Sequence, residues 1–349
     1  MHHRHPIFNR KELIRDCIAS ALAQTAAGLE ILVVDDRSTD GAWEVIQSFD
    51  DSRLRKVRNE TNLGLFGNFN RCCELARGRF LRLLCSDDRL PPDCLGGELA
   101  RMEADPELAF ITSINECRDV DGRLVRLASS FLPEMRLKGS DALRLFLRYW
   151  MGCWVWPVSI PSGILIRTAA LRRCGGFPTD LRVAGDVQCY LALCAQGDVY
   201  ISRHVGATVT IHPAQVTAEA LLHDPMTLAS ETLTIMRRLK GVLGGIVNTA
   251  KLKGSYCCLH LVKKQLLRSG RGHRVRCVAS CRIRSFGDAF WFSMGFAELL
   301  IDRAVLSCTG RSARSAAWIL RRDRATIRRG RAAASRADGR QPAADPVPP

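Results

Sequence analysis

Paired aspartates stand at two places where a short apolar segment of the sequence ends. Asp35-Asp36 follow the β-branched run 30–34, and Asp87-Asp88 come shortly after the apolar run 80–84. Neighbouring carboxylates hold hard divalent cations such as Mg²⁺ through oxygen, or they accept hydrogen bonds from donor groups of a ligand. They also cap helices, so a single pair is weak evidence for binding. Two pairs in the same context favour a binding site.

The segments around these aspartates alternate between strand-like and helix-like patterns. Strands are predicted over residues 30–34, 54–58, 80–84, 108–113 and 162–167. Helices are predicted over residues 11–24, 42–49, 68–76, 91–104, 139–150, 169–174 and 187–195. This alternation predicts an α/β fold with an open, mostly parallel sheet flanked by helices. Because ligands of such sheets bind outside the carboxyl ends of the strands, both aspartate pairs are expected to face one crevice.

The composition is that of a globular protein with a basic end. Of the 349 residues, 47% are hydrophobic and 25% are charged, which excludes wholesale disorder. The net charge of +16 lies entirely in residues 224–349, where 24 Lys and Arg stand against 8 Asp and Glu. The fifteen cysteines include no Cys-x-x-Cys pair, which excludes common zinc ribbons and thioredoxin-type sites. Dispersed cysteines of this kind are typical of a reducing compartment.

Neither secretion nor a membrane span is predicted from the sequence. No apolar run of signal-peptide length occurs before Asp16. The uncharged stretch 149–166 reaches transmembrane length, but Pro157 and Pro161 would break a helix there. A cytoplasmic protein is therefore expected.

The basic C-terminal third has two interpretations. An apolar stripe over residues 290–305 precedes arginines between positions 311 and 329, a combination that suits attachment to the anionic inner face of the plasma membrane. The alternative is a helix packed on the body with a solvated arginine tail. Nucleic acid is not expected as a partner, because the aromatic residues lie apart from most of the arginines.

Residues 6–215 resemble the large family of GT-A-fold, inverting glycosyltransferases called family 2. The resemblance is carried by the order and spacing of several short motifs rather than by one decisive piece. These motifs include Pro6-Ile-Phe-Asn-Arg10, Leu32-Val-Val-Asp-Asp-Arg-Ser-Thr-Asp-Gly41, Cys85-Ser-Asp-Asp-Arg-Leu-Pro91, Pro161-Ser-Gly163, Ala184-Gly-Asp186 and Ile211-His-Pro213.

The resemblance implies a role for each matching residue. Those implied to bind the nucleotide-sugar are Pro6, Phe8, Asn9, Asp36, Asn68 and Asp87. Asp88 and His212 are implied to lie at a Mg²⁺ or Mn²⁺ ion on the diphosphate, although packing is an equal alternative for His212. Cys85 stands where the family usually has its first acid, which leaves open whether Asp87 or Asp88 binds the metal. Asp186 matches the general base.

The reaction implied by the resemblance is transfer of a sugar from a nucleoside-diphosphate sugar to an alcohol acceptor with inversion. The expected acceptor is a surface polysaccharide or a lipid-linked glycan intermediate. A metal ion stabilises the departing diphosphate, and a carboxylate accepts the proton of the attacking hydroxyl. Two alternatives stay open: a catalytically silent sugar-nucleotide-binding or membrane-associated scaffold, and a sugar-nucleotide pyrophosphorylase. The latter usually carries a glycine- and lysine-rich phosphate loop near its start, which is not seen here.

Three regions are expected along the chain. Residues 1–223 form the GT-A glycosyltransferase domain, whose first strand is expected to be truncated because only Met1–His5 precede Pro6. Residues 224–330 are expected to form a basic helical extension. Residues 331–349 are expected to be a disordered tail, because their composition cannot build a core.

Overall fold

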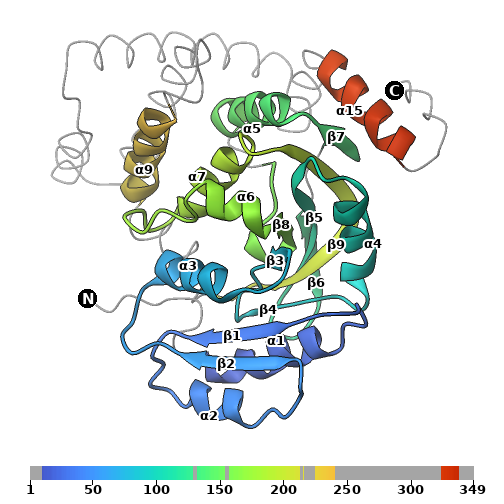
Figure 1. The fold of residues 1–349 in the computed structure, drawn as a ribbon. Helices are drawn as coiled ribbons and strands as arrows, with labels where there is room; N and C mark the ends of the chain where they lie inside the picture. Colours follow the sequence, from blue (N-terminus) through green and yellow to red (C-terminus); the bar gives the residue numbers. More distant parts are fainter. Residues whose placement is uncertain are drawn as a thin grey trace, which may run out of the picture.

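The computed structural model describes residues 10–128, 132–153, 157–212, 215, 225–239 and 324–337. Its α-helices are α1 (Lys11–Leu22), α2 (Ala42–Gln47), α3 (Leu65–Leu75), α4 (Cys94–Ala104), α5 (Gly139–Cys153), α6 (Thr168–Arg173), α7 (Gly185–Leu193), α9 (Pro225–Arg238) and α15 (Arg324–Ala337). Its strands are β1 (Ile31–Asp35), β2 (Leu54–Arg58), β3 (Phe80–Arg82), β4 (Asp88–Arg89), β5 (Leu108–Arg118), β6 (Leu124–Ala128), β7 (Met135–Leu137), β8 (Ile164–Arg167) and β9 (Asp198–Thr210), with a 3-10 turn, η1 (Pro161–Gly163), before β8. The predicted α/β fold with flanking helices is confirmed (Figure 1).

The strands form a small sheet and a large one. The small sheet pairs β1 with β2 in parallel. The large sheet has the order β3-β8-β5-β9-β4, with β6 added to β5 and β7 added to β9. Its longest pairing, between β5 and β9, is parallel, and its other pairs are antiparallel. The parallel pairing brings the ends of β5 and β9 to the same edge, from which the chain continues to His212.

The core of the large sheet lies between β5, β8, β9 and the helices α3, α5 and α7. Nearly every position along β5 is buried, as expected for a central strand covered on both faces. Phe66 and Phe69 of α3 pack on Phe177, with ring centroids 6.1 Å and 5.3 Å apart respectively. Phe177 also meets the ring of Tyr190 in α7 edge-on. Through Phe177, these ring contacts join α3 to α7, the helix that carries the predicted general base, Asp186.

A second core lies under the small sheet. The apolar face of α1, which includes Ile14 and Ile18, packs with β1, α2 and α4. A cavity of about 1200 Å³ lies between β1 and β3. Among the described residues, β1 pairs only with β2 and β3 only with β8. The predicted truncation of the first strand concerns residues 1–9, which lie outside the described part of the chain.

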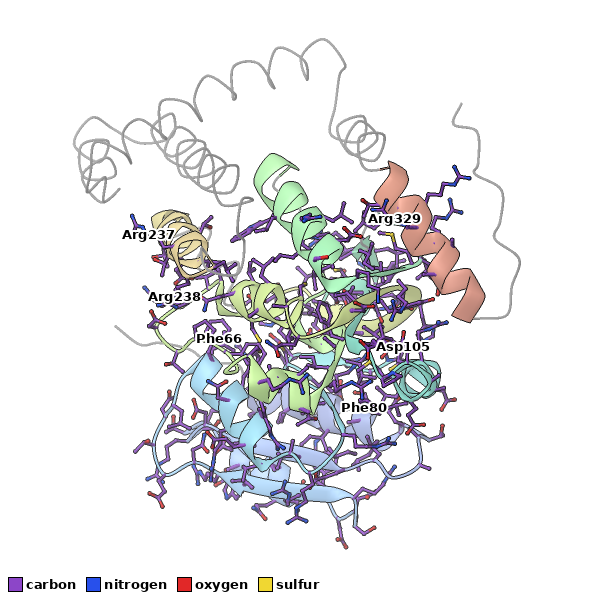
Figure 2. The ribbon with its side chains drawn as sticks, turned by 45° about the horizontal axis from the view of Figure 1, so that its top comes forward. Phe66, Phe80, Asp105, Arg237, Arg238 and Arg329 are labelled. Atoms are coloured by element: carbon purple, nitrogen blue, oxygen red, sulfur yellow. The ribbon has the colours of Figure 1, made fainter. Side chains whose placement is uncertain are left out.

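The C-terminal region contributes two described helices to this body. α15 packs beside β7, and Gly330 lies so close that a Cβ there would sit 2.8 Å from the carbonyl oxygen of Arg136. Arg329 also approaches Asp141 of α5 at 3.7 Å (Figure 2). α15 continues to Ala337, past residue 331, where the disordered tail was expected to begin. Within the described residues, no helix is both long and apolar enough to cross a bilayer.

Candidate functional site

Asp35 and Asp36 stand at the carboxyl end of β1 and are both fully buried. The carboxylate of Asp35 accepts hydrogen bonds from the backbone N–H of Ser38 at 3.3 and 3.2 Å and pairs with Arg58 at 3.0 Å. Burial raises the pKa of Asp35, while Ser38 and Arg58 oppose that rise. Asp35 therefore closes the turn that follows β1.

Asp36 binds the loop that leads into α3. Its Oδ1 accepts hydrogen bonds from Asn59 Nδ2 at 2.9 Å and from the N–H of Leu63 at 2.8 Å. Its Oδ2 accepts a third from the N–H of Gly64 at 3.0 Å. Both carboxylate oxygens are thus engaged by residues 59–64, and Asp36 fixes where α3 begins.

Asn68 belongs to the same buried network. Its Nδ2 donates to the carbonyl oxygen of Val34 at 3.1 Å, and its Oδ1 accepts from Asn59 Nδ2 at 3.0 Å. The structure therefore brings Asp36 and Asn68 together through Asn59. Their contacts with a nucleotide stay a prediction, as do those of Pro6, Phe8 and Asn9, which lie outside the described residues.

The second aspartate pair lies between the two sheets, where β4 adds to the edge of β9. Oδ2 of Asp88 accepts a hydrogen bond from Ser162 Oγ at 2.6 Å, and Ser162 Oγ in turn accepts one from the N–H of Cys85 at 3.0 Å. Asp88 is 2% exposed, and its Oδ1 has no hydrogen-bond partner among the described residues. Burial first, and then the neighbouring charge of Asp87, raise the pKa of Asp88 well above its ordinary value.

The groups around Asp88 fit a divalent cation. Ligand atoms of Cys85, Asp87 and Asp88 all lie within 4.8 Å of one another. β9 carries the chain to His212, whose Nε2 lies 3.0 Å from Oδ2 of Asp87. A buried carboxylate oxygen without a donor is costly unless a cation or another group approaches it. Carboxylates are suitable ligands for Mn²⁺ or Mg²⁺, whereas burial raises the pKa of the Cys85 thiol well above its ordinary value, so this thiol stays protonated and is a poor ligand for either ion.

Asp186 lies in the first turn of α7 and is partly buried. Burial raises its pKa to about 6, against hydrogen bonds from backbone N–H groups, including that of Val187 at 2.7 Å, that lower it. Such a carboxylate is ionised at neutral pH and more basic than an ordinary aspartate. Both properties suit a general base.

A contact between helices places Asp186 beside the loop that Asp36 holds. Gly185 packs so closely on Phe66 that a Cβ there would meet the Phe66 ring at 2.5 Å. Because Phe66 lies in the first turn of α3, the base stands beside the loop that Asp36 holds. One turn further along α7, burial raises the pKa of the Tyr190 hydroxyl, and the charges of Asp186, Cys189 and Cys85 raise it further.

Sequence reasoning missed three residues that build this site. Ser162 falls in a motif that was recognised, but the motif alone does not reveal its contact with Asp88. Asn59 stands just after β2 with no signal of its own. Glu231, which contacts the loop before α7, falls in the region predicted to be a separate extension.

Several known proteins are similar to this chain in sequence. The family model "Glycosyl transferase family 2" matches residues 5–174. An uncharacterized protein of Mycobacterium tuberculosis is 31% identical over 218 residues, covering 59% of this chain and 67% of that protein. The Escherichia coli enzyme WfaP, a UDP-Glc:alpha-D-GlcNAc-diphosphoundecaprenol beta-1,3-glucosyltransferase, is 34% identical over 98 residues, 28% of this chain and 39% of its own length.

A solved structure shares the fold. Staphylococcus aureus TarS 1–349 superposes with a TM-score of 0.53 at 19% identity, covering 71% of this chain and 67% of that one. Together with the strand and helix order, this similarity shows the fold expected of residues 6–215.

Proposed function

Because the chain belongs to glycosyltransferase family 2 and has the GT-A fold, we propose that it transfers a sugar from a nucleoside-diphosphate sugar to an alcohol with inversion at the anomeric carbon. The observation that carries this proposal is the buried Oδ1 of Asp88, which has no hydrogen-bond partner in the described part of the chain, within the cluster of Cys85, Asp87 and Asp88. A carboxylate of this kind is prepared for a cation that accompanies the donor diphosphate.

The cluster would hold the metal and the diphosphate. Asp88 is oriented by Ser162, and Asp87 lies against His212, so neither carboxylate is free to rotate away. A bound Mg²⁺ or Mn²⁺ would neutralise the charge that develops on the leaving diphosphate. His212 then keeps Asp87 directed toward the same point, whether or not it binds the ion itself.

Asp186 would accept the proton of the acceptor hydroxyl. An alcohol is a poor nucleophile until a positioned base takes its proton during attack, and such a base contributes about 10²–10⁴ in rate. A pKa of about 6 keeps Asp186 ionised at neutral pH while making it a stronger base than an unperturbed aspartate. Attack from the side of Asp186, opposite the diphosphate, inverts the anomeric configuration without a covalent intermediate.

The proposed acceptor is a lipid-linked glycan intermediate or a growing surface polysaccharide. The support is the printed activity of the E. coli relative, which acts on a diphosphoundecaprenol-linked sugar. The matched segment spans only 39% of that enzyme, so donor and acceptor are proposed as classes. Peripheral attachment to the inner face of the plasma membrane stays a prediction, because residues 240–323 lie outside the described part of the chain.

A donor panel tests the proposal. The full chain is incubated with UDP-, GDP- and dTDP-sugars, with and without a lipid-linked acceptor, in Mn²⁺, Mg²⁺ or EDTA. We expect nucleoside diphosphate release with one donor class, stimulated by acceptor and abolished by EDTA and by Asp88→Asn. In a further arm with added pyrophosphate, conversion of the donor to a nucleoside triphosphate and a sugar 1-phosphate would indicate a pyrophosphorylase. Donor binding without turnover would indicate a silent scaffold, and either result would overturn the proposal.

A further inference from the structure

The buried carboxylate of Glu231 is held by three consecutive backbone N–H groups. Glu231 lies in α9 and is 6% exposed. One of its oxygens accepts a hydrogen bond from the N–H of Arg182 at 2.5 Å, and the other accepts from Val183 at 3.0 Å and Ala184 at 2.7 Å. A carboxylate that accepts this many N–H bonds fixes the backbone that donates them.

The three donors directly precede the proposed base. Ala184 is the N-cap residue of α7, and Asp186 is in the first turn of that helix. The N-cap residue, Ala184, offers no side-chain hydrogen bond to this helix. Glu231 therefore satisfies, from another element, backbone donors that would otherwise be buried without partners near Ala184. Its negative charge is also favourable beside a helix N-terminus.

A second contact holds α9 against the same region. Arg238, labelled in Figure 2, lies in the last turn of α9. It pairs with Asp180 and donates a hydrogen bond to Gln188 Oε1 at 3.1 Å. Asp180 lies before the loop and Gln188 lies in α7, so α9 contacts both sides of the segment that carries Asp186. These contacts make α9 part of the catalytic body rather than of a separate extension.

We propose that Glu231 is a positioning residue that sets the orientation of Asp186 by fixing residues 182–184. This inference rests on the proposed function, since it assigns Glu231 to the base of that reaction. Any displacement of the loop would move the first turn of α7, and small displacements of a general base reduce rate strongly. The negative charge of Glu231 also raises the pKa of Asp186, because it disfavours ionisation of the base.

The charged surroundings of Asp186 make a pH readout specific. From α9, Glu231 raises the pKa of Asp186, and burial raises it more. On its own helix, Cys189 and Tyr190 lie within electrostatic reach of Asp186, and both thiol and hydroxyl have raised pKa values and stay neutral near pH 7. Removing the charge of Glu231 should therefore shift the acid limb of the pH profile to lower pH.

Three variants separate the effects of the Glu231 charge, of the length of its side chain and of the docking of α9. Glu231→Gln keeps the size of the side chain and removes the charge; Glu231→Asp keeps the charge and shortens the reach. Asp180→Asn is the matched control, because it weakens the docking of α9 through an exposed pair and leaves the loop N–H bonds intact. Each is compared with the wild-type chain by steady-state kinetics between pH 5 and 8, by donor affinity in Mn²⁺, and by hydrogen–deuterium exchange of a peptide covering residues 180–187.

We expect Glu231→Gln to lower kcat by about 10- to 100-fold with donor affinity within about twofold of wild type. Its acid limb should move to lower pH, and the amides of residues 182–184 should exchange at least about tenfold faster. Glu231→Asp should keep the acid limb near that of wild type while losing part of kcat. Asp180→Asn should match wild type in all three readouts.

The inference is overturned if Glu231→Gln keeps wild-type kcat, pH profile and exchange. It is equally overturned if kcat, donor affinity and exchange change alike in Glu231→Gln and Asp180→Asn, which would indicate general loosening of α9. Failure of the proposed function looks different: the wild-type chain itself would turn over no donor, while the exchange measurement would still report whether Glu231 fixes the loop.

Discussion

Replacing Asp186 with asparagine should abolish activity and at the same time stabilise the fold. The wild-type carboxylate has a pKa of about 6 against an ordinary value of 3.8, chiefly because it is desolvated. Ionised Asp186 is therefore less stable in the folded chain than in the unfolded chain. The substituted side chain would lack that charge, while its amide oxygen can still accept the N–H of Val187.

The size of the gain follows from the pKa difference. One pH unit of pKa difference corresponds to about 1.4 kcal/mol, so a rise from 3.8 to about 6 corresponds to about 3 kcal/mol. Because the side chain is partly exposed, water screens some of this penalty, and a gain of about 1–3 kcal/mol is expected for Asp186→Asn at neutral pH.

The sign of the pH dependence is fixed. Below pH 3.8 the side chain is protonated in both states, so wild type and Asp186→Asn should be equally stable. Between pH 3.8 and about 6 the unfolded chain loses the proton first, and the penalty grows; above pH 6 it is constant. Activity of the wild-type chain should fall about tenfold per pH unit below pH 6 because the base becomes protonated.

Urea denaturation from pH 4 to pH 8 measures the stability difference, and transfer kinetics over the same range measure the activity. Glu103→Gln, on the exposed side of α4, is the matched control and should change neither. The reasoning is refuted if Asp186→Asn is less stable than wild type at pH 7, or if its stability difference does not shrink toward pH 4. Turnover within tenfold of wild type would remove Asp186 from the mechanism.

Three further perturbations test how the site is built. Ser162→Ala removes the hydroxyl that orients Asp88, so we expect the affinity for Mn²⁺ to fall about 10- to 100-fold. Electron paramagnetic resonance of free Mn²⁺ measures this affinity, and an unchanged value would mean that Asp88 needs no such support. Gly185→Ala introduces a Cβ 2.5 Å from the Phe66 ring, so the free energy of unfolding, measured by urea denaturation, should fall by about 1–3 kcal/mol. Activity should fall as well, and a variant as stable as wild type would refute this packing. A chain ending at residue 323 lacks α15 and should melt several degrees lower in calorimetry, whereas an identical melting temperature would show that α15 does not stabilise the body.

The local patterns of the sequence predicted most helices and strands of the body. β1 is a short, mostly buried apolar run, and α1 has a clear apolar face. The longest strand, β9, was missed because Arg203 and His204 interrupt its apolar pattern. It exists because β5, about ninety residues earlier in the chain, offers a long parallel edge, and such nonlocal pairing leaves no local signal.

The residues of the candidate site also fall into those that the sequence indicated and those that it did not. Resemblance to known motifs selected Asp87, Asp88 and Asp186 as candidates, and their roles stay predictions. It was not sufficient to predict that both oxygens of Asp36 are engaged by its own loop. Nor did it indicate Glu231, whose role follows only from the docking of α9 on a loop that is nearly fifty residues earlier in the chain.

The configuration of the product tests the central claim most directly. Proton nuclear magnetic resonance of the transferred sugar, compared with that of the accepted donor, reports the anomeric configuration of the new glycosidic bond. The account predicts inversion, because Asp186 acts as a base on the acceptor opposite a diphosphate held by the Asp88 cluster. Retention of configuration would contradict it, since retention requires either a covalent intermediate or attack from the leaving-group side.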